Sequence, residues 1–230
     1  MIIFYNTMLY LVFILVCATL STQFAAIYRY NNLQIGLCYL PYGVGCCIAS
    51  VAQGHILDWN YRRIARQIGF TINLRRGDDL SKFPIERARL QPLYFAVVAG
   101  VAATIGYGWV LEAETSLAGP LVLVFVIGLC ITGSFSILST LIVDLYPEKP
   151  ATAIAALNLL RCLFGAGATA VVEKMIRTMG RGWCFTFWAL VVVVSSPILV
   201  VVTKWGPQWR EERRIRHLKQ REKEAARLEE

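Results

Sequence analysis

The chain has 230 residues, of which 57% are hydrophobic and 17% are charged. An ordinary soluble domain has about 45–50% apolar and about 25% charged residues, so this composition excludes a typical soluble globular protein. The net charge is +8, but the cations gather in two segments beside long uncharged runs. That distribution is typical of membrane proteins and argues against binding to nucleic acid.

Six nearly uncharged segments follow one another along the chain. Each supplies the ~20 residues that a membrane-spanning helix needs, and lipid favours helices because their backbone groups are paired internally. The predicted fold class is an all-α polytopic membrane protein with six transmembrane helices. The predicted bundle covers residues 1–203, with a charged tail at 204–230 and spans at about 2–28, 34–57, 91–111, 117–143, 151–172 and 182–203.

The first span begins almost at Met1, without a basic flank. A cleaved signal peptide has a positive amino-terminal region and a shorter apolar stretch, so we expect a retained helix. The abrupt start also suggests the latter part of a longer protein.

Small residues recur in several spans, where they permit close helix packing in lipid. The second span includes the Gly45-x-x-x-Ala49 spacing, and the third and fifth are also rich in glycine. A bundle with an interior is therefore expected. Pro41 and Pro197 interrupt backbone hydrogen bonding, and both a passive kink and a moving hinge are open interpretations.

The segment that leaves the second span contains Gly54, Asp58, Arg62 and Arg63. It opens the basic connection 58–90, which falls on the same membrane side as the tail because an even number of spans separates them. The positive-inside rule places both segments, and both termini, in the cytosol. On physical grounds alone, this segment is either an ordinary membrane-exit signal or a site where Asp58 accepts hydrogen bonds from a helix amino terminus.

Arg161 is a cation inside an otherwise apolar span. It lies about 15 Å from the start of that span, near the middle of the bilayer. Such residues usually face a protein interior or a water-filled path. Asn158 lies three residues earlier on the same helical face. A structural arginine bound to carbonyl groups and a functional arginine are both open interpretations.

Four parts of the sequence resemble the major facilitator superfamily. Its cytosolic loop signature reads G-x-x-x-D-B-x-G-B-B, where B is basic; Gly54, Asp58, Arg62 and Arg63 match it, whereas Trp59 and Tyr61 depart from it. Three further blocks are similar to fungal drug:proton antiporters of the quinidine-resistance type: 144–147, 158–167 and 179–187.

This resemblance implies the carboxyl-terminal six-helix half of a twelve-helix antiporter for multidrug efflux. Such a transporter exports small amphipathic or drug-like compounds against protons by alternating access, with substrate held between two halves. An amino-terminal six-helix half or a second copy is then needed, and the plasma membrane is the expected location. The resemblance assigns Gly54, Asp58, Arg62 and Arg63 to a cytosolic gate, Asn158 and Arg161 to an intramembrane polar pair, and possible cavity-lining positions to Tyr5, Asn6, Gln23, Ser134, Phe135 and Ser136.

Two alternatives remain. A truncated half that does not transport is one. An integral-membrane enzyme is the other, but a metal-dependent oxygenase needs clustered histidines, and the chain has only His55 and His217. We therefore predict no catalytic residues, no metal and no cofactor; the predicted partners are the lipid bilayer, a small-molecule substrate and protons.

Overall fold

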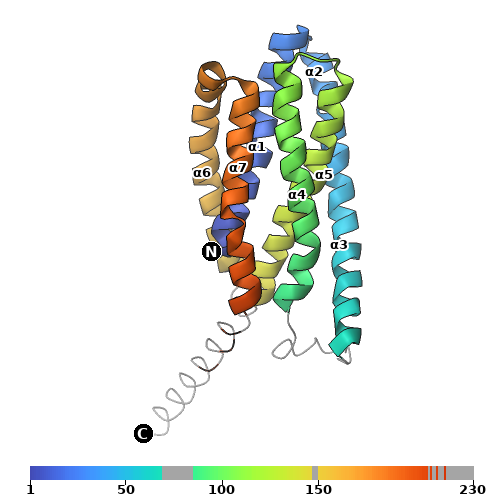
Figure 1. Ribbon diagram of the computed structural model, residues 1–230, viewed down its shortest axis with the longest axis vertical. Coiled ribbons are helices and arrows are strands. Elements are labelled where there is room, and N and C mark those ends of the chain that lie inside the picture. Colours follow the sequence, from blue (N-terminus) through green and yellow to red (C-terminus); the bar gives the residue numbers. More distant parts are fainter. Residues whose placement is uncertain (69–84, 147–149, 207, 209–210, 212–214, 216–230) are drawn as a thin grey trace.

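The structure is a computed structural model that describes residues 1–68, 85–146, 150–206, 208, 211 and 215. Its elements over these residues are α-helices that stand side by side in an upright bundle (Figure 1). Their bounds are α1 Ile2–Tyr28, α2 Asn32–Cys38, α3 Leu40–Ile68, α4 Ile85–Glu112, α5 Ala118–Leu145, α6 Pro150–Met179 and α7 Arg181–Ser195.

These helices supply six stretches in the described residues that are long and apolar enough to cross a membrane. One stretch, Asn32–Ile68, combines α2 and α3, and another, Arg181–Gly206, extends α7. The predicted all-α polytopic fold is confirmed. Helix α3 continues through the first part of the predicted connection 58–90, because exposed arginines let a helix extend beyond an apolar span into water. Residues 69–84 of that connection, and most of the predicted tail 204–230, lie outside the described residues.

Prolines explain the two interruptions within spans. Pro41 has no N–H with which to continue the helix, and the chain forms a turn at Tyr39, whose N–H donates to Gly36 O at 3.2 Å. The same happens before Pro197, where Ser196 N–H donates to Val193 O at 3.0 Å. Both are tightened three-residue turns rather than α-helical ones. The sequence therefore located the breaks, and a hinge role for them stays a prediction.

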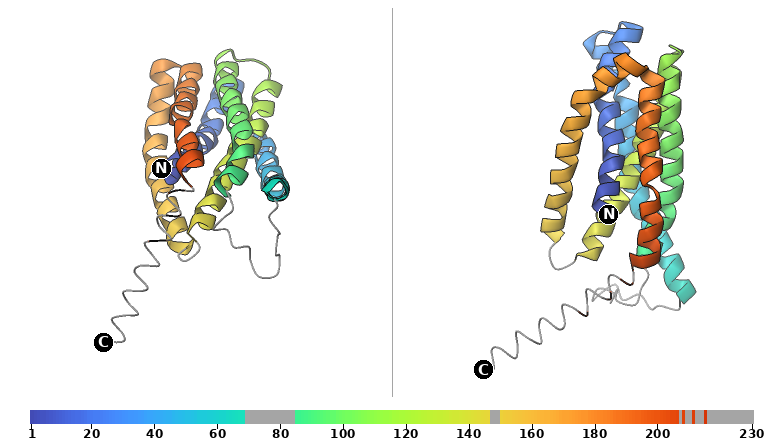
Figure 2. Two further views of the ribbon diagram at one scale, coloured as in Figure 1. Left: turned by 60° about the horizontal axis from the view of Figure 1, so that its bottom comes forward. Right: turned by 60° about the vertical axis from the view of Figure 1, so that its left-hand side comes forward.

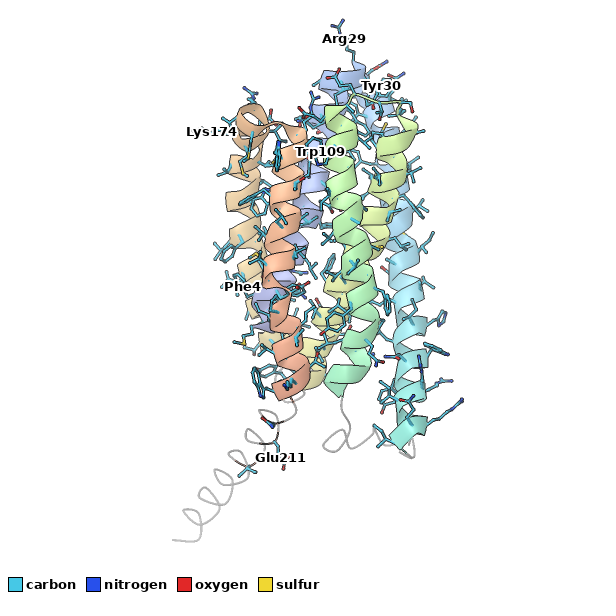
Figure 3. All side chains as sticks on the ribbon, in the orientation of Figure 1. Phe4, Arg29, Tyr30, Trp109, Lys174 and Glu211 are labelled. Atoms are coloured by element: carbon cyan, nitrogen blue, oxygen red, sulfur yellow. The ribbon has the colours of Figure 1, made fainter. Side chains whose placement is uncertain are left out.

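The ends of the helices are sorted between the two ends of the bundle. Helix α3 ends, α4 begins, α5 ends and α6 begins at the lower end in Figure 1, whereas the α1–α2, α4–α5 and α6–α7 connections lie at the upper end. Figure 3 places Arg29, Tyr30 and Lys174 at the upper end and Glu211 beyond the lower one. Assignment of the lower end to the cytosol stays a prediction from its basic residues.

Burial divides the helices into an inner and an outer group. Of the most apolar window of each span, 56% of α1 is buried, against 22% of the α2–α3 span and 17% of α6. Helices α3 and α6 lie at opposite edges of the bundle in Figure 1. Helix α5 packs against α3 and α4, α7 packs against α4, and α1 lies between α5 and α6, as Figure 2 also shows.

Two glycines set the close approach of α3 to α5. A Cβ atom added at Gly45 would lie 2.5 Å from Phe125 O, and one added at Gly128 would lie 2.7 Å from Tyr42 O. These neighbours are backbone atoms, which cannot move aside as a flexible side chain would. At Gly43 and Gly54, by contrast, an added Cβ would meet no described atom within 4 Å. Helix α3 therefore has one glycine-lined face against α5 and another that is exposed.

Candidate functional site

The predicted polar pair Asn158 and Arg161 lies where α6 meets α1 and α5. Arg161 Nη2 donates a hydrogen bond to Asn158 Oδ1. The Arg161 Cζ atom lies 5.0 Å from the ring centroid of Tyr10 on α1 and 5.8 Å from that of Phe135 on α5. Both distances are within the range of cation–π attraction. We call Asn158, Arg161, Tyr10 and Phe135 the Arg161 cluster.

Further aromatic rings extend this cluster toward α3. The ring of Phe13 lies 5.6 Å from that of Phe135 in an edge-to-face contact and 5.4 Å from that of Tyr42. Tyr42 is fixed in turn, because its hydroxyl donates to Phe13 O at 3.1 Å. Such aromatic pairs contribute about 0.5–1.5 kcal/mol each beyond burial. The rings that face Arg161 are therefore held by packing from three helices.

Arg161 has no carboxylate partner in the described part of the chain. The ion pairs there join Arg89 to Asp144, Arg177 to Glu173 and Arg181 to Glu114. An unpaired cation in a membrane span is costly and is usually functional. The Arg161 cluster is therefore the candidate site.

The six predicted cavity-lining residues fall into different environments. Phe135 belongs to the Arg161 cluster, and Asn6 is next to it: its Nδ2 donates to Phe135 O at 2.9 Å and to Ser139 Oγ at 3.2 Å. Ser134 is buried and its hydroxyl donates to Cys130 O of its own helix at 2.7 Å. Tyr5 is fully buried, and Ser136 is partly buried.

Gln23 lies in a second polar cluster, centred on Arg181. Arg181 Nε donates to Gln23 Oε1 at 2.8 Å, and its Nη1 donates to Leu111 O at 3.2 Å and to Glu114 Oε1 at 3.1 Å. The carboxylate of Glu112 accepts from the backbone N–H of Arg181 at 2.8 Å and so caps the start of α7. This Arg181 cluster joins α1, α4 and α7 at the upper end of the bundle.

A pocket of about 400 Å³ opens beside the Arg181 cluster, and Gln23 and Arg181 both line it. Sequence reasoning assigned no role to Arg181. The available signal was charge complementarity, since Glu112 and Glu114 lie at and just after the end of α4, and Arg181 begins α7 at the same end of the bundle.

The predicted gate residues lie along the outer face of α3. Gly54, Asp58, Arg62 and Arg63 are all exposed, and Arg63 Cζ lies 5.5 Å from the ring centroid of Trp59. The structure thus presents a carboxylate and two guanidinium groups outward rather than to another described helix. A different ion pair connects α4 to α5: the Nε and Nη2 atoms of Arg89 each lie 3.1 Å from Asp144 Oδ2.

The chain is similar in sequence to several fungal transporters. The chain is 39% identical over 206 residues to the MFS-type transporter clz19 of Cochliobolus lunatus, which covers 90% of the chain and 39% of that relative. It is 35% identical over 192 residues to the MFS-type transporter tstD of Talaromyces stipitatus, covering 84% of the chain and 35% of the relative. The chain is homologous to MFS-type transporters. These relatives support the predicted resemblance to the major facilitator superfamily.

A third relative has a different name. Citrate exporter 1 of Aspergillus niger is 34% identical over 222 residues, covering 93% of the chain and 41% of the relative. The chain thus spans between 35% and 41% of the lengths of these three relatives. Their names describe transporters rather than enzymes. No family model and no solved structure matches the chain.

Proposed function

We propose that the chain forms one six-helix half of a transmembrane transporter that exports small amphipathic or drug-like compounds, coupled to protons, by alternating access. One observation carries this proposal: an arginine within a membrane span lies against two aromatic rings, with no carboxylate among its described neighbours. Ionisable side chains within membrane spans commonly line substrate pathways. The names of the relatives support transport as the activity.

A complete path needs a second six-helix half, supplied by an amino-terminal half or by another copy of the chain. The exposed faces of α3 and α6, and the empty space beside Gly54, support this requirement. The chain also spans less than half of each of the relatives described above. In this proposal Asp58, Arg62 and Arg63 form a cytosolic gate that pairs with the second half, both termini are cytosolic, and the membrane is the plasma membrane.

Flux measured in proteoliposomes tests the proposal. The full chain is reconstituted alone, and also together with the part of clz19 to which it does not align. Efflux of a fluorescent amphipathic dye is then followed with and without an imposed proton gradient. We expect gradient-dependent efflux in at least one arrangement, with a large loss in Arg161→Ala and in Asp58→Asn.

The matched control is Arg177→Gln, because Arg177 lies on α6 like Arg161 but its side chain is 77% exposed. This variant should retain the wild-type flux. Absence of flux in both arrangements would favour a half that does not transport. Equal flux in the wild type, Arg161→Ala and Asp58→Asn would remove the assigned roles of these two residues.

A further inference from the structure

None of the helices that pack against α6 supplies an acidic residue to balance the positive charge of Arg161. Helix α6 contacts α1, α5 and α7. Helices α1 and α7 contain no Asp or Glu, the acidic residue of α5 is Asp144, and that of α6 itself is Glu173. Asp144 pairs with Arg89, and Glu173 pairs with Arg177. Glu173 is also about 18 Å from Arg161 along the helix, at 1.5 Å per residue. The described helices therefore leave a net positive charge at this depth.

The Arg161 guanidinium also has hydrogen-bond donors that no described residue uses. Its Nη2 is used by Asn158, whereas Nε and Nη1 make no hydrogen bond to a described residue. A guanidinium presents its N–H groups as a planar fork that matches the two oxygens of a carboxylate. The half-buried position of Arg161 leaves this fork accessible from the exposed face of α6.

The aromatic rings beside the guanidinium add a second kind of contact. Tyr10 and Phe135 meet edge to face, with ring centroids 6.2 Å apart, and both lie next to the guanidinium. They offer apolar and aromatic surface next to a cationic fork. A ligand that combines an acid group with an apolar ring would complement both features, whereas an organic cation would be repelled by Arg161.

We propose that the Arg161 cluster binds the ionised acid group of an amphipathic organic anion, with Tyr10 and Phe135 contacting its apolar body. Asn158 positions the guanidinium by accepting one N–H of Nη2, and the second N–H of Nη2 forms the fork for the acid group together with the adjacent N–H of Nη1 or Nε. This inference rests on the proposed function and narrows its substrate class from amphipathic compounds in general to organic anions.

Binding of matched ligands to the full chain in lipid nanodiscs tests this proposal without requiring transport. The probes are 1-naphthoate, neutral 1-naphthamide and cationic 1-naphthylmethylammonium, titrated calorimetrically at neutral pH. We expect 1-naphthoate to bind at least about tenfold more tightly than the amide, as charge-assisted hydrogen bonds are stronger than neutral ones. The ammonium compound should bind more weakly than the amide.

Variants assign the effect to the guanidinium. Arg161→Gln should lower the affinity for 1-naphthoate at least about tenfold and leave that for 1-naphthamide unchanged. Arg161→Lys should keep part of the anion preference, because it retains the charge but not the fork. Arg177→Gln should bind like the wild type. If Arg161→Gln does not fold, the ligand comparison on the wild type and on Arg161→Lys still decides the question.

Equal affinity of the wild type for 1-naphthoate and 1-naphthamide would overturn the proposal, as would an unchanged affinity for 1-naphthoate in Arg161→Gln. The failure of the transport function is distinguishable from these results. Anion binding that depends on Arg161 in a protein without flux supports the site and contradicts transport. Flux that is equal for the amide and the carboxylate contradicts the site and leaves transport intact.

Discussion

The packed and the exposed sides of this bundle use the same residue types for different purposes. On the packed side, Arg181 donates to Gln23, Leu111 O and Glu114, which come from α1 and from the end of α4 and the turn after it. On the exposed side, Arg161 donates to Asn158 of its own helix and otherwise faces two rings. An arginine whose donors are used by other helices holds those helices together. One whose donors are left over is available to a ligand.

Glycine follows the same division. Gly45 and Gly128 face each other's helices at backbone contact distance, whereas Gly43 and Gly54 have open space beside them. The first pair sets the separation of α3 and α5. The second pair lies on a face that has room for another helix. Substitutions can therefore test the division at both residue types.

The largest expected effect is that of Arg181→Gln. This change removes the guanidinium hydrogen bonds to Gln23, Leu111 O and Glu114, whereas the backbone N–H of residue 181 still donates to Glu112. We expect a loss of about 2–3 kcal/mol in the free energy of unfolding, measured by equilibrium unfolding in mixed micelles followed by circular dichroism. Arg177→Gln is the control, expected to change stability by less than about 0.5 kcal/mol because its ion pair is exposed. Equal losses in the two variants would contradict a structural role for Arg181.

Gly45→Ala and Gly128→Ala come next. Each added Cβ would meet a backbone oxygen within 2.7 Å, so the helices must separate, and we expect a loss of about 1–3 kcal/mol for each. Gly43→Ala meets no described atom and should be neutral or stabilising by up to about 1 kcal/mol, because alanine favours the helix. The same unfolding measurement compares the three variants; a loss in Gly43→Ala as large as that in Gly45→Ala would remove the distinction.

A smaller effect is expected at the opposite end of the packed side. The side chains of Arg89 and Asp144 are 18% and 21% exposed, so solvent partly screens their ion pair. A double-mutant cycle with Arg89→Gln and Asp144→Asn should give a coupling energy of about 1 kcal/mol. Additive effects of the two changes would show that the pair does not connect α4 to α5 energetically.

A small change in stability is expected for Arg161→Gln, on the exposed side of the bundle. This variant loses two cation–π contacts but also removes an unpaired charge from a membrane span, and the two effects oppose each other. We expect the free energy of unfolding to stay within about 1 kcal/mol of the wild-type value, while binding of 1-naphthoate is lost. A loss comparable to that of Arg181→Gln would instead make Arg161 a structural residue.

The six spans could be predicted because lipid constrains their length and composition, and the two breaks could be predicted because proline has no N–H. The sequence did not predict which face of each helix packs against its neighbours. Span residues are apolar on both the packed and the lipid-facing sides, so no hydrophobic periodicity distinguishes Gly45 from Gly43. The partners of Arg181 lie between 67 and 158 residues away in the sequence. The sequence therefore did not indicate that Arg181 donates to Gln23, and the cavity-lining role of Gln23 stays a prediction.

The position of the two rings relative to Arg161 has a consequence for how the chain enters the membrane. An arginine at the centre of an isolated helix costs about 2.5–3.5 kcal/mol to insert, whereas a desolvated cation–π contact returns about 2 kcal/mol. Tyr10 and Phe135 precede Arg161 along the chain, so the ribosome delivers both rings before the cation. We therefore expect α1 and α5, the two helices that supply these rings, to precede α6 into the membrane and to lower the cost of inserting Arg161.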